Sequence, residues 1–459
     1  MRLSPFSTMR ENSSFSRAKR RKNLVGLFAV MFIVATVAAT TGLASASTRW
    51  HANAKKANTS HSASKSHQNN HQGTKGRGGN ATTPTTKAPT TSTSPATTAP
   101  TTDEPSTTTP TSAPATTTTR PDPTDGSAPA LHVAGNHIVT AAGNAVQLRG
   151  VNRPGPEYAA VEGDGIFDGP TNDDVSIAAM KAWGINSVRI PLNEDSWLGI
   201  NNVDPAYNGA PYRAAIVDYV HRLNANGIIA IPNLHFSAPG GTVPDDQSPM
   251  ADEDHSPAFW QSVASTFKGN PSVILDVFNE PYPDNNNDTT AAWSCVLNGG
   301  TCSGVSYQTA GMQQLVDVIR ATGATQPLMI AGPEYAGDLD RWVRYEPIDP
   351  LHQLIASVHI YGLPLDSPYR VSSTWDTYIT PVTAQVPVII GEFGDTNCTS
   401  AFSPPLMTWA DAHGVGYFAW AWVTSNCAGD PALITNYDGT PTPYGVGVRT
   451  HLLAQPKEW

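Results

Sequence analysis

The sequence predicts an α/β protein, a (β/α)8 TIM barrel preceded by a disordered N-terminal stalk. Three observations lead to this prediction. The composition changes abruptly near residue 128 of the 459-residue chain. Beyond that point, short apolar runs alternate with segments that have helical apolar spacing. Polar and aromatic residues follow the ends of the apolar runs, which is where such a barrel carries its binding loops.

Residues 1–47 have the features of an export signal. A basic cluster between Arg17 and Lys22 precedes an apolar run from Leu24 to about Ala39, and the small residues Ala44-Ser45-Ala46 follow. This order is typical of a cleaved secretory signal peptide. The apolar run is also nearly long enough to span a bilayer, so an uncleaved signal anchor is the alternative. Both interpretations place the rest of the chain outside the cell, either extracellular or at the cell surface.

Residues 48–128 contain almost no large apolar side chains, and Thr and Pro dominate from Ala81 to Thr124. Such a segment cannot bury enough apolar surface to offset the entropy lost on ordering, so we expect a disordered linker. It would tether the folded domain to a membrane anchor or hold it off the cell wall. Metal binding by four histidines at its start is disfavoured, because they are irregularly spaced and lack carboxylate neighbours: His51, His61, His67 and His71.

Charge divides at the same boundary. Residues 1–128 carry 15 Lys/Arg and 5 Asp/Glu, whereas residues 129–459 carry 13 Lys/Arg and 33 Asp/Glu. A domain this acidic would repel nucleic acid and anionic polymers, which favours a neutral substrate. The length of residues 129–459 suits one large domain, and the expected form is a monomer.

The folded domain begins with a predicted hairpin around the Gly135-Asn136 turn. Eight strand candidates follow, and near-continuous apolar runs such as Pro387-Val388-Ile389-Ile390 are typical of parallel strands buried on both faces. The strand candidates are residues 148–151, 187–190, 228–234, 273–278, 328–330, 355–359, 386–390 and 417–422. Helical spacing occurs at residues 173–183, 211–225, 257–268 and 307–321.

All four cysteines lie in the acidic domain, and an even number in an exported protein indicates disulfides. Loop placement favours Cys295–Cys302, which would close the loop after the fourth strand. It also favours Cys398–Cys427, which would join the loops after the seventh and eighth strands. Free thiols are the alternative for a cytosolic protein, and the lack of CxxC spacing disfavours a zinc site.

Two glutamates stand at the ends of apolar strands. One strand runs directly into Asn279-Glu280-Pro281, and another runs through Ile390-Gly391 into Glu392. Hydrolysis of a glycosidic bond by double displacement needs one group that protonates the leaving oxygen and another that attacks the anomeric carbon. Because the fourth and seventh strands face each other across a barrel mouth, these glutamates are candidates for the two roles.

The two motifs resemble those of glycoside hydrolase family 5, the cellulase-type retaining β-glycanases of the large β/α-barrel clan. The resemblance covers about residues 130–455 and rests on Phe278-Asn279-Glu280-Pro281 combined with Ile390-Gly391-Glu392-Phe393-Gly394. It implies that Glu280 is the acid/base and Glu392 the nucleophile. Further matches are Leu148-Arg149-Gly150-Val151-Asn152, Val188-Arg189-Ile190-Pro191, Leu234-His235, His359-Ile360-Tyr361 and Ala419-Trp420.

The resemblance also implies roles for residues around the glutamates. Arg189 and Tyr361 would hold Glu392 ionised, since a neighbouring guanidinium lowers the pKa of a carboxyl group. Asn279 would bind the 2-hydroxyl of the attacked sugar. The remaining members are His235 and His359, which would contact sugar hydroxyls and tune Glu280, and Trp420, which would stack on a sugar ring.

Other polar and aromatic residues near strand ends have simpler expected roles. We expect Glu194, Asp195 and Glu334 to cap loops or face solvent. Calcium binding by the acidic residues 245–254 is conceivable, but their spacing matches no EF-hand, which favours a solvated loop. Aromatic residues that either stack on sugars or belong to the core are Tyr158, Trp197, Phe236, Trp293, Tyr335 and Trp422.

The leading hypothesis is a secreted retaining endo-β-1,4-glucanase that acts on a polysaccharide. A β-mannanase, a xylanase, a β-1,3-glucanase or an exo-glucanase remains open, because loops decide specificity on a shared barrel. A non-catalytic glycan-binding surface protein is the alternative from another class, and the intact glutamate pair argues against it. The sequence predicts no cofactor and no metal, since it contains neither a Gly-rich nucleotide motif nor a clustered ligand set.

Overall fold

The computed structural model describes residues 126–169, 174–362, 372–395, 398–424, 427 and 431–459. The expected signal segment (1–47) and nearly all of the expected linker (48–128) lie outside these residues. Within the described part of the chain, no helix is both long and apolar enough to cross a membrane. Packing begins slightly before residue 129, because Ala128 is buried and its N–H donates to the carbonyl of Asn224 at 2.8 Å.

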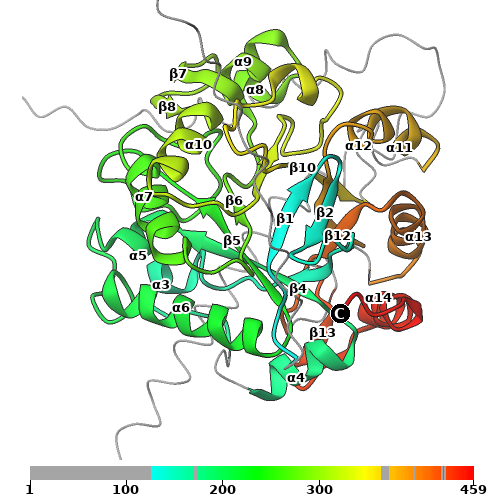
Figure 1. Ribbon diagram of the computed structural model, residues 1–459. Coiled ribbons are helices and arrows are strands. Elements are labelled where there is room, and N and C mark those ends of the chain that lie inside the picture. The colour runs from blue at the N-terminus through cyan, green and yellow to red at the C-terminus, as the bar shows by residue number, and fades with distance from the viewer. Residues whose placement is uncertain (1–125, 170–173, 363–371, 396–397, 425–426, 428–430) are drawn as a thin grey trace, which may run out of the picture. The chain divides into compact units, whose positions relative to one another are not determined.

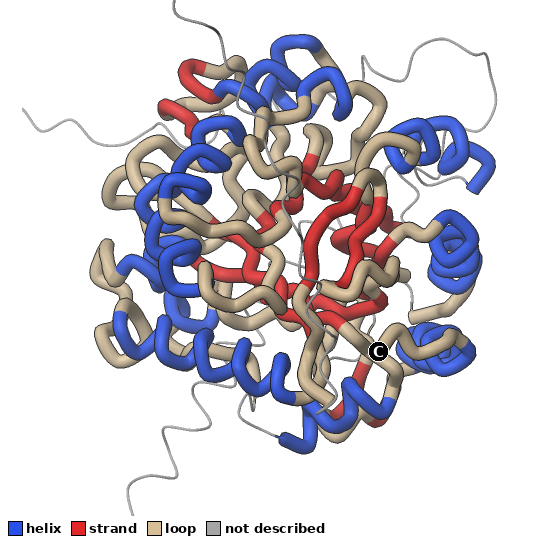
Figure 2. The backbone as a smooth tube through the Cα atoms, viewed as in Figure 1, coloured by secondary structure: helices blue, strands red, loops and turns tan. Residues whose placement is uncertain are grey.

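Parallel strands close into a barrel in the order β10-β11-β12-β3-β4-β5-β6-β9 (Figures 1 and 2). The chain therefore adopts the predicted (β/α)8 barrel, and each strand candidate contributes one strand. The strands are β3 (Arg149–Asn152), β4 (Ser187–Asn193), β5 (Ile229–Phe236), β6 (Leu275–Asp276), β9 (Leu328–Ala331), β10 (Leu354–Tyr361), β11 (Val388–Gly394) and β12 (Gly416–Ala419).

Helices surround the barrel strands (Figure 2). They are α3 (Ala159–Glu162), α4 (Asp174–Ala182), α5 (Glu194–Leu198), α6 (Ala210–Ala225), α7 (Ser256–Phe267), α8 (Pro283–Asn286), α9 (Thr290–Asn298), α10 (Met312–Ala321), α11 (Ser372–Tyr378), α12 (Thr380–Thr383), α13 (Ser403–His413), α14 (Pro443–Ala454) and the 3-10 helix η1 (Trp342–Tyr345). Two strands near the C-terminus, β13 (Ile434–Asn436) and β14 (Thr440–Pro441), form a small antiparallel hairpin.

The fourth predicted helix, residues 307–321, is too long at its start. Residues Gln308–Ala310 form strand β8, which pairs with β7 (Gly299–Thr301), and α10 begins only at Met312. The helical spacing is real from Met312 onward, where residues 312, 315, 316 and 319 are buried on one face. The disulfide Cys295–Cys302 joins α9 to the residue after β7, so the β7–β8 pair belongs to a disulfide-closed excursion after β6.

An N-terminal hairpin of β1 (Leu131–Ala134) and β2 (His137–Thr140) covers the end of the barrel where the strands begin. Its apolar side chains pack with inward-facing residues from the starts of the barrel strands. Since the hairpin occupies this end, the opposite end of the barrel remains for a binding site. The packed residues are Leu131, Val133 and Ile138 of the hairpin, and Leu148, Ile229, Ile274, Met329, Ile355, Ile389 and Phe418 of the barrel.

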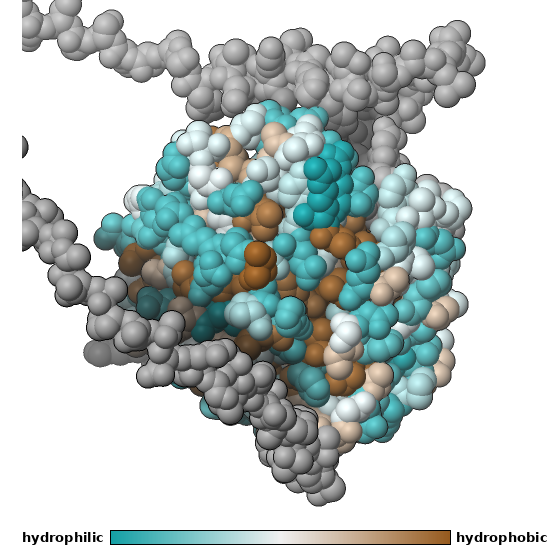
Figure 3. Space-filling view, turned by 45° about the horizontal axis from the view of Figure 1, so that its top comes forward, coloured by the Kyte–Doolittle hydropathy of each residue, from teal (hydrophilic) through white to brown (hydrophobic). Residues whose placement is uncertain are grey.

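Most other buried apolar residues lie in one large cluster that includes side chains from the strands and the surrounding helices. On the face drawn in Figure 3, hydrophilic residues predominate over the described surface, and hydrophobic areas are smaller and interspersed. The strands contribute buried apolar side chains both to this cluster and to the one beneath the N-terminal hairpin. This burial on both faces explains why the strands are nearly continuous apolar runs in the sequence.

Candidate active site

Arg189, in β4, is the centre of a buried hydrogen-bond network. Its Nε donates to Asp276 Oδ2 at 2.6 Å, and its Nη2 donates to Asn279 Oδ1 at 2.8 Å. Its Nη1 donates to Asn152 Oδ1 at 2.9 Å and to Glu392 Oε1 at 2.7 Å. A guanidinium presents its donors in a rigid planar fork, so it fixes each of these groups in direction as well as distance. The network joins residues from four strands, namely β3, β4, β6 with the segment directly after it, and β11.

Glu392, in β11, accepts hydrogen bonds on both carboxylate oxygens. Tyr361 Oη donates to its Oε2 at 2.6 Å, while Arg189 occupies Oε1. Burial raises the pKa of Glu392 and the charge of Glu280 raises it further, whereas the Arg189 guanidinium and the Tyr361 hydrogen bond lower it. Because Glu392 touches the Arg189 guanidinium directly and Glu280 does not, Glu392 is the one of the two glutamates that better carries a negative charge.

Glu280, which follows β6, has different neighbours. Gln247 Nε2 donates to its Oε2 at 2.8 Å, and His359 Nδ1 lies 2.7 Å from its Oε1. Burial raises the pKa of Glu280 to about 7, against the opposing effects of the Gln247 hydrogen bond and of Arg189. Burial lowers the pKa of His359 to about 3, so the imidazole is neutral and adds no positive charge beside Glu280. Glu280 therefore holds a proton at pH values where an ordinary glutamate has lost it.

The two glutamates are close together. A carboxylate oxygen of Glu280, one of Glu392 and a ring nitrogen of His359 all lie within 4.8 Å of one another. Retaining glycosidases hold their carboxyl groups about 5–5.5 Å apart, whereas inverting enzymes need about 6.5–9.5 Å to admit a water molecule. The observed spacing suits one carboxylate that attacks a sugar carbon and one carboxylic acid that protonates the leaving oxygen.

Gly391 explains how His359 fits between these residues. The register of β10 and β11 shifts here, since Val358 pairs with Ile390 and His359 pairs with Glu392. A Cβ atom at position 391 would lie 2.8 Å from His359 Nε2, which is closer than real Cβ atoms approach a neighbour. The absence of a side chain at position 391 therefore leaves room for the imidazole. The bulge in the β10–β11 pairing directs Glu392 toward the site.

His235 and Trp420 form the other side of the site. Their rings stack with centroids 5.7 Å apart and an interplanar angle of 18°. His235 Nδ1 lies 2.9 Å from Asn233 Oδ1, and burial lowers the pKa of His235 well below its ordinary value. Trp420, which a cis peptide bond joins to Ala421, is only half-buried, so part of its indole ring is accessible.

All eight predicted site residues therefore lie at the same end of the barrel, but four members of the network were not predicted as site residues: Asn152, Asn233, Gln247 and Asp276. Asp276 and Asn233 carry a signal in the sequence, because each is a polar residue with apolar neighbours on both sides. Asn233 Nδ2 donates to Asp276 Oδ2 at 3.0 Å, and the same Asp276 oxygen accepts from Arg189 Nε. Both residues therefore help to fix the position of the Arg189 guanidinium. Gln247 lies in a long loop after β5, and no local pattern connects it with Glu280.

The structure decides between the alternatives that the sequence left open for several residues near the strand ends. Glu194 and Asp195 do not face solvent, because both are 0% exposed, and Asp252 in the acidic loop is also fully buried. Three of the six aromatic candidates belong to the core, since Trp197, Trp293 and Trp422 are 0–1% exposed. In contrast, Tyr335 is 41% exposed and stacks on Tyr282 with ring centroids 4.3 Å apart. Tyr282 Oη donates to the carbonyl of Gln247, which places this pair beside Glu280.

Both predicted disulfides are present. Cys295 and Cys302 are joined with their Cα atoms 5.8 Å apart, and Cys398 and Cys427 are joined with theirs 5.1 Å apart. The first bond closes the excursion after β6, and the second joins the segments after β11 and β12. Since β6 precedes Glu280 and β11 contains Glu392, each disulfide constrains a loop that follows a strand of the site.

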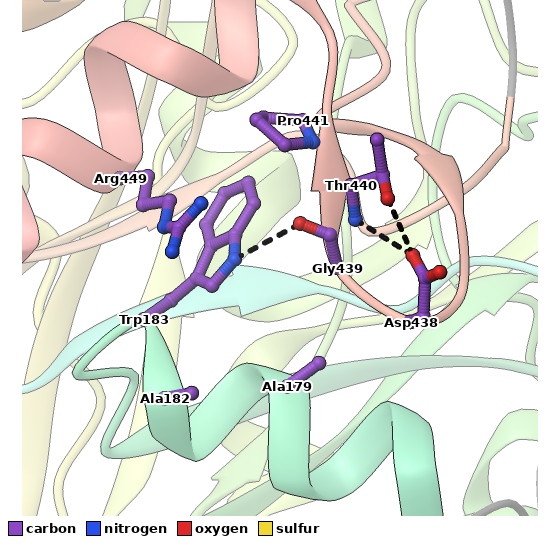
Figure 4. Close-up of a pocket in the computed structure, with 8 residues that line it drawn as sticks. All are labelled: Ala179, Ala182, Trp183, Asp438, Gly439, Thr440, Pro441 and Arg449. Carbon is purple, nitrogen blue, oxygen red and sulfur yellow. Dashed lines mark hydrogen bonds between the residues drawn. The ribbon is translucent and has the colours of Figure 1, made fainter.

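A separate hollow of about 330 Å³ lies between α4, the β13–β14 hairpin and α14 (Figure 4). Trp183 lines it and donates from Nε1 to the carbonyl of Gly439 at 3.2 Å. The Arg449 guanidinium lies 5.8 Å from the Trp183 ring. Because Trp183 is only 2% exposed, it offers no free ring face for a sugar, and the hollow contains none of the residues of the glutamate site.

Comparison with known proteins agrees with this geometry. Residues 139–426 match the model of the family described as cellulase (glycosyl hydrolase family 5). A protein of Caldicellulosiruptor saccharolyticus named β-mannanase/endoglucanase A is 25% identical over 296 residues, which are 61% of this chain and 19% of that protein. A mannan endo-1,4-β-mannosidase of Streptomyces lividans is 23% identical over 65% of this chain and 67% of its own length.

Among solved structures, the β-glucanase SdGluc5_26A from Saccharophagus degradans superposes with a TM-score of 0.54 and 21% identity, covering 71% of this chain and 93% of that one. This likeness concerns the fold. The family match covers both glutamate motifs and all the strands of the barrel, and it ends before the last part of the chain. The chain therefore belongs to glycosyl hydrolase family 5, and it is a glycoside hydrolase.

Proposed function

We propose that this chain is an exported, retaining endo-β-1,4-glucanase in which Glu392 is the nucleophile and Glu280 is the acid/base. The observation that carries the proposal is a pair of buried glutamates with carboxylate oxygens within 4.8 Å of each other, one beside a cation and the other beside neutral groups. Glu392 lies against the Arg189 guanidinium at 2.7 Å. Glu280 lies against a neutral imidazole and an amide, and its pKa is raised to about 7.

In the first step, a Glu392 oxygen attacks the anomeric carbon while Glu280 protonates the glycosidic oxygen, and the bond to the leaving sugar breaks. The glycosyl group is then bonded covalently to Glu392. In the second step, Glu280 is ionised and takes a proton from a water molecule that attacks the same carbon and releases Glu392. A pKa near neutrality suits Glu280, because it has to donate a proton once and accept one in each cycle.

Asn279 has the geometry to bind the sugar in the attacked position. Arg189 fixes its Oδ1, and its Nδ2 is buried without a hydrogen-bond acceptor among the described residues. A buried donor without a partner is costly, so a sugar hydroxyl would satisfy it. The half-buried Trp420 ring, which stacks on His235, supplies an apolar surface for the same sugar.

β-1,4-Mannan is the second candidate substrate. It is favoured by the names of two relatives, one called β-mannanase/endoglucanase and the other mannan endo-1,4-β-mannosidase. For β-glucan, the corresponding support is the structure of the Saccharophagus β-glucanase in complex with cellotetraose. Glucose and mannose differ in the orientation of the 2-hydroxyl, so the group contacted by Asn279 distinguishes them.

The purified full-length chain should be assayed for reducing-sugar release on soluble cellulose, β-mannan, xylan and β-1,3-glucan, with product sizes analysed over time. We expect highest kcat/KM on β-1,4-glucan and oligosaccharides as early products. Early products that are only mono- or disaccharides would contradict the endo mode, and preference for mannan would select the second candidate.

Glu392→Gln should abolish hydrolysis without loss of the folded state. Glu392→Gln protein that keeps activity would contradict the assigned nucleophile. The matched control is Glu346→Gln, since Glu346 is a partly buried glutamate that lies after the 3-10 helix η1 and is not part of the site network. If wild-type products first appear as the α-anomer, the retaining mechanism is wrong.

Export is part of the proposal. It is supported by the basic cluster and apolar run of residues 17–39, and by Ala44-Ser45-Ala46. The two disulfides also support export, because disulfides form and persist in oxidising compartments outside the cytoplasm. Fractionation of expressing cells followed by N-terminal sequencing should find the protein outside the cytoplasm and beginning near Ser47. Intact protein in the membrane fraction would instead identify an uncleaved anchor.

A further inference from the structure

A second group of buried titratable side chains lies apart from the glutamate network. Glu194 and Asp195 open the short helix α5, which follows β4. Asp252 and His255 come from the loop that connects β5 with α7, and α5 and α7 lie beside each other in the barrel wall (Figure 1). The three carboxyl groups are 0% exposed, and the His255 side chain is 22% exposed.

Three of the six carboxyl oxygens in this group lack the donors that buried carboxylates normally have, while Ser256 Oγ also lies 3.3 Å from Asp252 Oδ2. Ser256 Oγ donates to Glu194 Oε2 at 2.5 Å, and the His255 backbone N–H donates to Asp252 Oδ1 at 2.7 Å. Glu194 Oε1 and both Asp195 side-chain oxygens are buried and have no hydrogen-bond donor among the described residues. In the same part of the chain, no Lys or Arg forms an ion pair with the three carboxyl groups. Three acids so enclosed need a positive charge or protons from elsewhere.

The unpaired oxygens converge on one point. One carboxyl oxygen of Glu194, one of Asp195 and a ring nitrogen of His255 all lie within 4.8 Å of one another. His255 Nδ1 is 3.8 Å from Glu194 Oε1 and 3.8 Å from Asp252 Oδ1. A divalent cation with ligand distances of about 2.0–2.6 Å contacts atoms that are up to roughly 4–5 Å apart. We propose that Glu194, Asp195, Asp252 and His255 bind one divalent cation.

The ligand set suggests which cations to test. Carboxylates with one imidazole are accepted by Mn²⁺ and Zn²⁺, whereas Ca²⁺ prefers oxygen ligands alone and would use the three carboxylates and the nearby Ala238 carbonyl. The Ala238 oxygen is 3.3 Å from His255 Nδ1, so it lies at the edge of the same group. The competing explanation is a proton shared between Glu194 and Asp252, which needs no ion.

The cation would have a consequence for the active site. It would bridge α5 to the loop of residues 237–255, and Gln247 of that loop donates to the Glu280 carboxyl group. Ser248 of the same loop donates from Oγ to the carbonyl of Ser237, which closes the loop on itself. Cation binding therefore braces the segment that positions Gln247. This consequence rests on the proposed role of Glu280, but cation binding itself does not.

The test is calorimetric titration of the chelator-treated full-length protein with Mn²⁺, Zn²⁺ and Ca²⁺ in separate experiments. We expect at least one cation to bind with a stoichiometry of one to this site. At a free concentration of about 100 times its Kd, it should raise Tm by on the order of 5 °C. If none of the three binds, or none changes Tm, the proposal is overturned and the shared proton explains the cluster.

Two variants locate the binding. Glu194→Gln keeps the shape and the Ser256 contact but removes a ligand charge, so it should weaken binding at least about 10-fold. Glu253→Gln is the matched control, because Glu253 is exposed in the same loop and outside the cluster, and it should bind as the wild type does. Equal binding by both variants would refute the site even if the protein binds a cation elsewhere. Should Glu194→Gln fail to fold, Asp195→Asn replaces it, and the wild-type titration still decides whether a cation binds at all.

Discussion

Replacement of Gln247 by alanine tests the electrostatics of Glu280. The proposed mechanism requires Glu280 to be protonated, and its pKa is about 7 because burial penalises the charged form. The kcat/KM value should therefore fall as the pH rises through about 7. The Gln247 amide donates to Glu280 Oε2 at 2.8 Å, and this bond favours the charged form and lowers the pKa. Removing it should move the basic limb to higher pH.

The magnitude follows from the strength of the bond. A hydrogen bond to a charged group contributes about 1.5–3 kcal/mol, and one pKa unit corresponds to about 1.4 kcal/mol. Gln247 is only partly buried, so water will replace part of the interaction, and we expect an upward shift of about one unit. At pH 8, the protonated fraction of Glu280 would then rise from about 0.1 to about 0.5, which is roughly a fivefold change.

The assay is kcat/KM on a soluble β-glucan from pH 4 to 10, with each protein normalised to its own maximum. Gln313→Ala is the control, because Gln313 donates to Asp317 and to the Ile348 carbonyl on the outer face of α10. An unchanged basic limb in Gln247→Ala, or one that moves to lower pH, would refute the assignment of this limb to Glu280.

Three further predictions concern the surroundings of the pair. Tyr361→Phe removes a 2.6 Å hydrogen bond that favours the ionised form of Glu392. The acid limb of kcat/KM should therefore move to higher pH, and the maximum should fall about 10-fold. An unchanged acid limb would exclude this role of Tyr361. Gly391→Ala should displace His359 and lower kcat at least about 10-fold. The control is Gly269→Ala, where the added Cβ meets open space and kcat should not change. Equal kcat values for the two variants would show that the close contact with His359 does not matter. Loss of the Cys398–Cys427 disulfide, which has a sequence separation of 29, should lower the free energy of unfolding by about 3.5 kcal/mol. Loss of Cys295–Cys302, which has a separation of 7, should lower it by about 2.5 kcal/mol. Denaturant unfolding of the two Cys→Ala double variants checks the order, and a larger loss for the shorter loop would contradict the entropic argument.

Features that depend on a single strand and its end could be predicted from the sequence alone. The apolar runs located all eight barrel strands, because a parallel strand buried on both faces has to be apolar along its length. The same reasoning located Glu280 and Glu392, since a polar residue directly after such a run lies at the end of the barrel where the loops converge. Both cysteine pairings also followed from the order of the strands.

Contacts between distant segments required the tertiary structure. Gln247 is 33 residues from Glu280 and has no distinguishing neighbours, so only the folded loop brings its amide to the carboxyl group. Glu194, Asp195 and Asp252 resemble solvated loop residues in the sequence, yet α5 and the loop before α7 enclose them. The sequence by itself determined the barrel, its two catalytic candidates and its disulfides, because these depend on the period and ends of apolar strands. Tertiary structure decided which polar groups share a buried site, because hydrogen bonds and burial depend on how loops from different strands pack together.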